Sequence, residues 1–159
     1  MNPAHWHLIL NHIPVVGSAF ALGLLGWGML RRSEELKRAG LAAVVLVAAL
    51  TAPAYLTGAP AFEGVMEILE ATPVDEDPLV KAHKNAAGIA FTAAALAGAA
   101  ALAGLIRGRG GKPLSGRIVT AVLVLTAVTA ALMARAANFG GAIQHAEIRG
   151  GAIPAEDRN

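Results

Sequence analysis

The sequence predicts an all-α integral membrane protein, a bundle of four helices that run alternately up and down. Three observations predict this class. The 159-residue chain is 55% hydrophobic and only 15% charged, whereas soluble proteins average about 25% charged residues. Four apolar stretches approach the length of about 20 residues that a helix needs to cross a bilayer. Finally, most of the basic residues gather in two of the segments that connect these stretches.

The four predicted spans are separated by short polar segments. The first ends at a pair of arginines, the second carries Pro53 near its end, the third consists almost wholly of Ala, Gly and Leu, and the fourth is interrupted by Arg135. Short connections between consecutive helices favour a single four-span domain, residues 1–159, with up-down-up-down topology. We expect the spans at residues 8–30, 39–56, 85–106 and 118–139.

Charge predicts how the bundle is oriented. Eight of the thirteen Lys and Arg residues lie in the connections after the first and third spans: Arg31, Arg32, Lys37, Arg38, Arg107, Arg109, Lys112 and Arg117. Basic connections of membrane proteins face the cytoplasm. Both termini should therefore lie outside, with the chain in the bacterial inner membrane as a multi-pass protein.

The middle connection, residues 59–82, is acidic and should lie outside. Its acids Glu63, Glu67 and Glu70 recur at helical spacing, which predicts a short amphipathic helix that ends at Thr72-Pro73. This helix could be a solvated surface element or a docking surface for a positively charged partner.

All five histidines fall in segments that this topology brings to the outer end of the bundle. They are His5, His7, His12, His83 and His145. Histidine is the commonest metal ligand and is costly in hydrocarbon, so the set predicts a metal or haem site at one membrane face. The chain has no cysteine, which excludes disulfides, iron–sulfur clusters, thiolate zinc sites and covalent haem attachment.

His12 and His83 are the preferred pair of axial ligands for one haem b. His12 lies inside the first apolar run, beside Asn11, and Pro14 should kink this run near its start. His83 opens the third span. Because the first and third spans should be parallel and diagonal in the bundle, the two imidazoles should lie at similar depth on opposite sides of its axis. His5 and His7 are interpreted as interfacial residues or as further ligands of a bare metal ion.

The end of the fourth span supplies further candidates. Gly140-Gly141 should end or bend the helix, so that residues 140–159 form an outer C-terminal tail. His145 could be a third ligand, a group that supports the ligands or a proton carrier. Arg135 and Arg149 could pair with haem propionates, although Arg135 could equally extend its charge to the membrane interface.

These residues favour a b-type cytochrome-like electron-transfer protein or subunit, with one haem near the periplasmic face. It would take electrons from quinol or pass them to a periplasmic redox partner. The protein would lie in the lipid bilayer, where it could belong to a larger membrane complex. A copper- or zinc-binding protein is one alternative, and a structural subunit of a respiratory complex is another. No nucleophile and base pair is visible, so a stand-alone enzyme is less favoured. No nucleic-acid partner is expected.

Four short motifs also carry a resemblance. They are the histidine–proline segment at residues 7–14, Thr57-Gly58 after the second span, His83 at the start of the third, and Gly140-Gly141 with His145 after the fourth. The chain thereby resembles a family of small bacterial four-helix membrane proteins of unknown function. The resemblance implies the same fold, with outer-face histidines suspected of binding haem or a metal.

Overall fold

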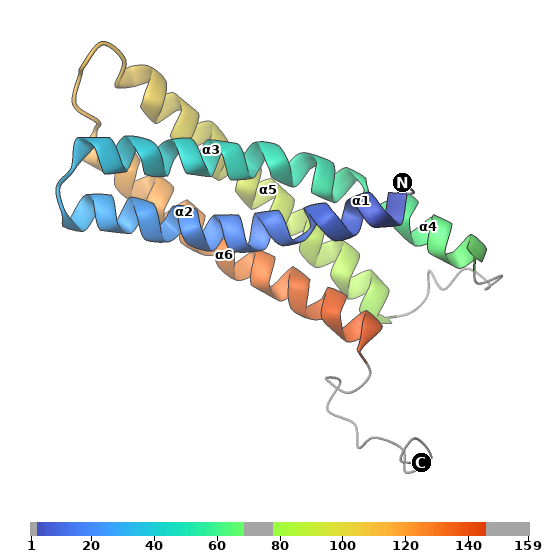
Figure 1. Cartoon of the computed structure of the whole chain (residues 1–159). Helices are drawn as coiled ribbons and strands as arrows, with labels where there is room; N and C mark the ends of the chain where they lie inside the picture. Colours follow the sequence, from blue (N-terminus) through green and yellow to red (C-terminus); the bar gives the residue numbers. More distant parts are fainter. Residues whose placement is uncertain (1–2, 69–77, 146–159) are drawn as a thin grey trace.

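The computed structural model describes residues 3–68 and 78–145, and every regular element within these ranges is an α-helix (Figure 1). The helices are α1 (Pro3–Leu10), α2 (His12–Leu30), α3 (Glu34–Leu56), α4 (Gly58–Ile68), α5 (Pro78–Arg107) and α6 (Gly116–Gln144).

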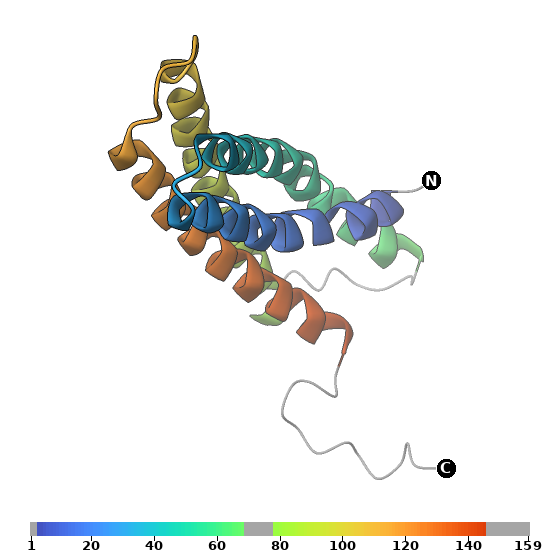
Figure 2. The same ribbon diagram turned by 60° about the vertical axis from the view of Figure 1, so that its left-hand side comes forward.

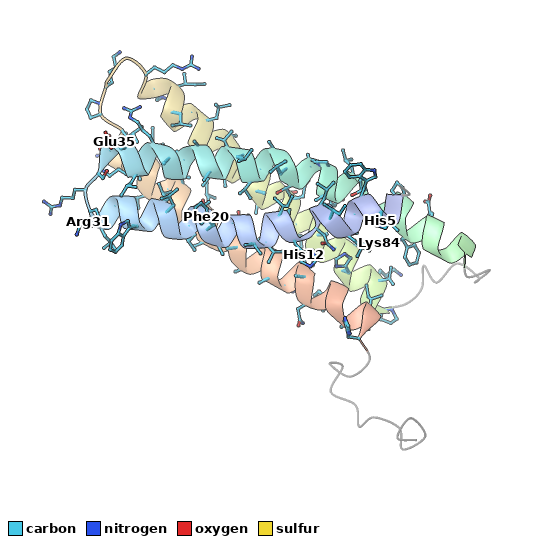
Figure 3. The ribbon with its side chains drawn as sticks, in the orientation of Figure 1. His5, His12, Phe20, Arg31, Glu35 and Lys84 are labelled. Carbon is cyan, nitrogen blue, oxygen red and sulfur yellow. The ribbon has the colours of Figure 1, made fainter. Side chains whose placement is uncertain are left out.

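Four helical stretches are long and apolar enough to cross a membrane: Ala4–Leu30, Glu34–Gly64, Pro78–Arg107 and Gly116–Ile143. The all-α class and the four apolar spans are thus confirmed, and they indicate a multi-pass membrane protein. The apolar side chains that face outward are consistent with lipid contact, since Val16 and Phe20 are each 66% exposed (Figure 3).

The helices extend beyond the predicted spans, and two expectations about their ends change. α5 begins at Pro78, a residue well suited to the first helical position, so His83 lies inside a helix. α6 continues through Gly140-Gly141 to Gln144, and the expectation that this pair ends the helix is wrong. Glycine costs a helix only about 1 kcal/mol relative to alanine, which neighbouring contacts can offset. Residues 140–144 therefore belong to α6 and not to a tail.

α4 confirms a short helix in the acidic connection, over Gly58–Ile68. Glu63 is exposed there. Glu70 and Thr72-Pro73 lie outside the described residues, as does the tail after His145.

The first helical rod is bent at Asn11, between α1 and α2. Pro14 explains the bend, because its ring clashes with the carbonyl four residues earlier, on Leu10, and it offers that carbonyl no N–H. Asn11 keeps helical backbone angles (φ −64°, ψ −24°), so α1 and α2 continue in nearly one direction (Figure 1). The helix is thus interrupted near the start of the first span, where a kink is expected, and α1 stays nearly in line with α2 (Figure 1).

Two helical hairpins make up the bundle. The first pairs α1 and α2 with α3, and the second pairs α5 with α6; α3 also packs on α5, and α2 on α6. α2 and α5 therefore lie diagonally, as expected. The hairpins cross at an angle in both ribbon views (Figure 2). Their main apolar contact includes Ala21, Leu25, Leu41, Ala97, Ala101 and Val122.

The two basic connections meet at one end of the bundle. The backbone N–H of Leu114 donates to Glu34 Oε2 at 2.9 Å, and Lys37 Nζ lies 2.9 Å from Glu34 Oε1. Arg38 donates to the carbonyl of Lys112 at 2.6 Å. The contacts of Leu114 with Glu34 and of Arg38 with Lys112 connect the two hairpins at the basic end. The histidines lie toward the opposite end, where His5 and His12 are seen in Figure 3.

Candidate functional site

His7 is held against the end of α3. It is partly buried, and its ring Nδ1 lies 3.1 Å from the carbonyl oxygen of Ala54 and 3.3 Å from Thr57 Oγ1. A carbonyl oxygen can only accept, so Nδ1 carries the proton and donates it. The second ring nitrogen, Nε2, then keeps its lone pair and is free to act as a ligand.

His83 is held in the same way against α6. Its Nδ1 lies 2.9 Å from the carbonyl oxygen of Ala136, and the same reasoning leaves a lone pair on Nε2. The two imidazoles, from α1 and α5, are near enough for an electrostatic interaction. Metal-ligating histidines commonly donate their other ring N–H to a carbonyl, which fixes the tautomer and the ring orientation. Both side chains have this arrangement.

A glycine lies beside each ring. A Cβ added to Gly58 would be 3.4 Å from His7 Cε1, and one added to Gly140 would be 3.1 Å from His83 Cε1 and 3.3 Å from its Nδ1. Each glycine is four residues after the alanine whose carbonyl accepts the hydrogen bond. At Gly140 the missing side chain therefore leaves space that the ring of His83 needs to reach that carbonyl, whereas a methyl group on Gly58 would lie at an ordinary contact distance from His7.

Asn11 adds an unpaired acceptor near His7. Its backbone N–H donates to the carbonyl of His7 at 2.9 Å, and residues four apart lie on one face of a helix. Its Oδ1 is buried and has no hydrogen-bond partner among the described residues. A buried oxygen without a partner costs about 1–3 kcal/mol. The two Nε2 atoms and this oxygen offer lone pairs only, which suits a metal centre or a ligand that donates hydrogen bonds.

The other predicted residues lie apart from this pair. His12 is exposed, and its Nδ1 lies 3.2 Å from the carbonyl of Leu8 in the same helical rod. His5 and His145 are also exposed, and the backbone N–H of His145 caps α6 by donating to Gly141. Arg135 is exposed, with its guanidinium 5.5 Å from the ring centre of Phe139. Arg149 lies outside the described residues.

Aromatic contacts brace the helices around the histidines. The rings of Tyr55 on α3 and Phe91 on α5 stack with centroids 4.9 Å apart. The ammonium of Lys84 lies 5.2 Å from the ring centre of Phe62 on α4. These contacts connect the first hairpin to α5 close to His83.

The sequence favours His12 as a haem ligand and includes His7 only as an interfacial residue or a ligand of a bare metal ion, and it does not single out Asn11, Gly58 or Gly140 as residues beside the ligands. In the structure His7, and not His12, is held by another helix. A usable signal was present. The buried positions of α2 follow alternating steps of three and four residues from Pro14 to Gly28, and continuing this pattern backwards reaches Asn11 and then His7. His12 falls outside the pattern.

The described ranges contain no convergence of three or more His, Asp or Glu side chains that could hold a metal ion. Comparison of the chain with protein-family models, curated proteins and solved structures found no match.

Proposed function

We propose that this chain is a b-type cytochrome-like electron-transfer protein or subunit of the bacterial inner membrane. One haem near the periplasmic face would have His7 and His83 as axial ligands. The observation that supports this best is that two imidazoles on diagonal rods each have Nδ1 held by a backbone carbonyl, with Nε2 left for iron. His83 keeps its predicted role, and His7 takes the place of His12, whose ring bonds within its own helical rod.

The number of ligands favours haem over a bare ion. The porphyrin supplies four nitrogens to the iron, so the protein needs only two axial imidazoles. Zinc sites use three or four protein ligands. Bound haem would supply one-electron chemistry, while the chain orients both imidazoles and keeps the site in the membrane.

A copper or zinc site is the second candidate, and Asn11 is the observation that favours it. Its buried, unpaired Oδ1 could complete a set of two imidazole nitrogens and one oxygen. In the haem proposal the same oxygen accepts a hydrogen bond from a water. A structural subunit, in which both histidines only cap helix carbonyls, is the third candidate.

The direct test is the visible spectrum and pyridine haemochrome assay of the protein purified from haem-replete cells. We expect one haem per chain, lost in His7→Ala and in His83→Ala. His12→Ala and His5→Ala are matched controls that remove an exposed imidazole from the same rod, and both should keep the haem. Elemental analysis of the same samples separates the candidates. Stoichiometric copper or zinc in a colourless protein would favour the second, and absence of all three the third.

Arg135 and His145 can be tested in the same assay. If they pair with propionates or support a ligand, Arg135→Gln or His145→Ala should alter the spectrum without abolishing binding. Quinol and a periplasmic redox partner would then be examined as electron donor and acceptor with the haem-loaded protein.

A further inference from the structure

The two hairpins share one pattern of buried positions. Every buried residue of α2 has a buried counterpart 76 positions later in α5, and His7 and His83 are related by the same shift. The pairs are Pro14 and Ala90, Ser18 and Ala94, Ala21 and Ala97, Leu25 and Ala101, and Gly28 and Gly104.

A related shift connects the second helices of the hairpins. Five of the six buried residues of α3 have buried counterparts 82 positions later in α6: Gly40 and Val122, Val44 and Thr126, Val47 and Thr129, Thr51 and Met133, and Ala54 and Ala136. The same shift relates the N-cap serines Ser33 and Ser115. It also relates Gly58 to Gly140. Ser33 follows Gly28 by five positions, whereas Ser115 follows Gly104 by eleven, and these six extra positions account for the larger shift.

The packing of the helices has the symmetry that these shifts require. If α2 corresponds to α5 and α3 to α6, the contact of α2 with α3 corresponds to that of α5 with α6. The contact of α3 with α5 then corresponds to that of α6 with α2, and all four contacts are present. A small cavity between the hairpins is lined by counterparts from both. They are Ser18 with Ala94, Ala21 with Ala97, Val44 with Thr126, and Val47 with Thr129. A pseudo-two-fold axis therefore runs along the bundle, as in membrane proteins built from parallel repeats.

We propose that the chain is a duplicated helical hairpin, and that His7 and His83 are equivalent ligands of one site on its pseudo-two-fold axis. Gly58 and Gly140 act as the positioning residues of these ligands. The identity of the ligand rests on the function proposed above, whereas the equivalence of the two imidazoles does not. The symmetry favours a flat metal-bearing macrocycle coordinated alike on both faces. Asn11 breaks the symmetry, because its counterpart is Ala87.

The role of the glycines follows from the geometry of each ring. In both repeats the imidazole donates to the carbonyl of an alanine, Ala54 or Ala136, and passes the glycine four residues later. A methyl group on residue 140 would crowd the ring of His83 and push it from the carbonyl, whereas one on residue 58 would meet the ring of His7 at an ordinary contact distance and disturb it less. The imidazole would then lose the hydrogen bond that fixes its tautomer and strengthens it as a ligand.

The first experiment uses the ligand-free protein. Nitrogen NMR of ¹⁵N-histidine-labelled protein reports the tautomer of each imidazole at about pH 8.5, well above the ordinary imidazole pKa of about 6.5. His7 and His83 should show the Nδ1–H tautomer, with the signals assigned by their loss in His7→Gln and His83→Gln. Gly140→Ala should change only the signal of His83, and Gly58→Ala should change only that of His7, by a smaller amount because the added methyl group meets this ring at an ordinary contact distance. Gly23→Ala, where an added Cβ meets nothing within 4 Å, should change neither.

The second experiment uses the haem-loaded protein. Gly140→Ala should weaken haem retention about 10-fold and shift the low-spin electron paramagnetic resonance signal, and Gly58→Ala should have a smaller effect of the same kind. His7→Ala and His83→Ala should lose haem alike. Circular dichroism and size-exclusion chromatography check that each variant is folded. If a glycine variant is unfolded, the tautomers of His7 and His83 in the wild-type protein still test whether both rings donate from Nδ1.

The outcomes separate this inference from the proposed function. A protein without haem whose two imidazoles show the expected tautomers and glycine dependence would retain the inference and remove the proposed function. A haem protein in which only one of the two histidines is needed would overturn the equivalence. Nε2–H tautomers in the wild type, or folded glycine variants without effect on tautomer and spectrum, would overturn the role of the glycines.

Discussion

At the scale of single residues, Asn11 is the residue of the site that should lower the stability of the protein when no ligand is bound. Its side-chain oxygen is buried without a partner, and its position follows from the bend that Pro14 imposes on the first rod. Protein interiors rarely keep an unpaired acceptor, and those that persist call for an explanation such as a ligand or water. We therefore expect Asn11 to lower the stability of the ligand-free protein and to contribute to binding of the ligand.

Replacing Asn11 with leucine, a side chain of similar shape, should stabilise the ligand-free protein. The expected gain is about 1–3 kcal/mol, the desolvation cost of the unpaired group, while retention of haem or metal should fall. Thermal unfolding in detergent, with and without the bound group, measures both effects. Asn85→Leu is the control, because Asn85 is exposed on α5 and should change neither. A loss of stability in ligand-free Asn11→Leu would show that its oxygen already has a partner.

At the scale of helices, glycines set how closely the two helices of the first hairpin approach. A Cβ on Gly40 of α3 would lie 2.8 Å from Leu25 Cα on α2, and one on Gly28 would lie 2.8 Å from the backbone nitrogen of Lys37. These are contacts with backbone atoms, which cannot move aside as a side-chain tip can. Small residues at helix contacts allow this approach in membranes, where the hydrophobic effect gives little drive to associate.

Gly40→Ala should therefore destabilise the bundle by about 1–3 kcal/mol, the usual cost of overpacking. Unfolding in graded sodium dodecyl sulfate, followed by circular dichroism, gives the free-energy difference. Gly23→Ala is the matched control, since Gly23 lies in the same hairpin with nothing within 4 Å of an added Cβ. The control should be neutral or slightly stabilising, because alanine favours helix. Equal stability of the two variants would mean that the hairpin relaxes around the methyl group.

The helices themselves could be predicted from the sequence because long apolar runs have few alternatives in a bilayer. The residues at which the helices end could not be predicted. Gly140-Gly141 resembles a helix stop, but whether a glycine pair ends a helix depends on the tertiary contacts around it, here the ring of His83 beside Gly140. The choice between His7 and His12, by contrast, could have been predicted, because the spacing of the buried positions of α2 continues back to Asn11 and His7 and passes over His12.

At the scale of the whole molecule, the two ends of the bundle differ in the residues that they carry. The basic connections meet at one end, while the histidines and α4 lie toward the other (Figure 1). Helix packing alone does not orient such a bundle in a bilayer; the distribution of Lys and Arg does so during insertion. The pseudo-two-fold repeat is consistent with this, because both copies of the hairpin carry their basic connection at the same end and must insert in the same direction.

The absence of native cysteine allows this orientation to be tested with single-cysteine variants. Arg32→Cys and Arg109→Cys place a thiol in the two basic connections, and Glu63→Cys and His145→Cys place one at the opposite end; all four positions are exposed. If the basic end is cytoplasmic, a membrane-impermeant maleimide added to spheroplasts should label only Glu63→Cys and His145→Cys. Permeabilised cells, in which all four should react, control for thiol reactivity. Labelling from outside at Arg32→Cys or Arg109→Cys would show that the topology is the reverse of the one expected. Labelling at only one of Glu63→Cys and His145→Cys would show that the two positions lie on different sides of the membrane, which contradicts a site that needs the histidines on one face.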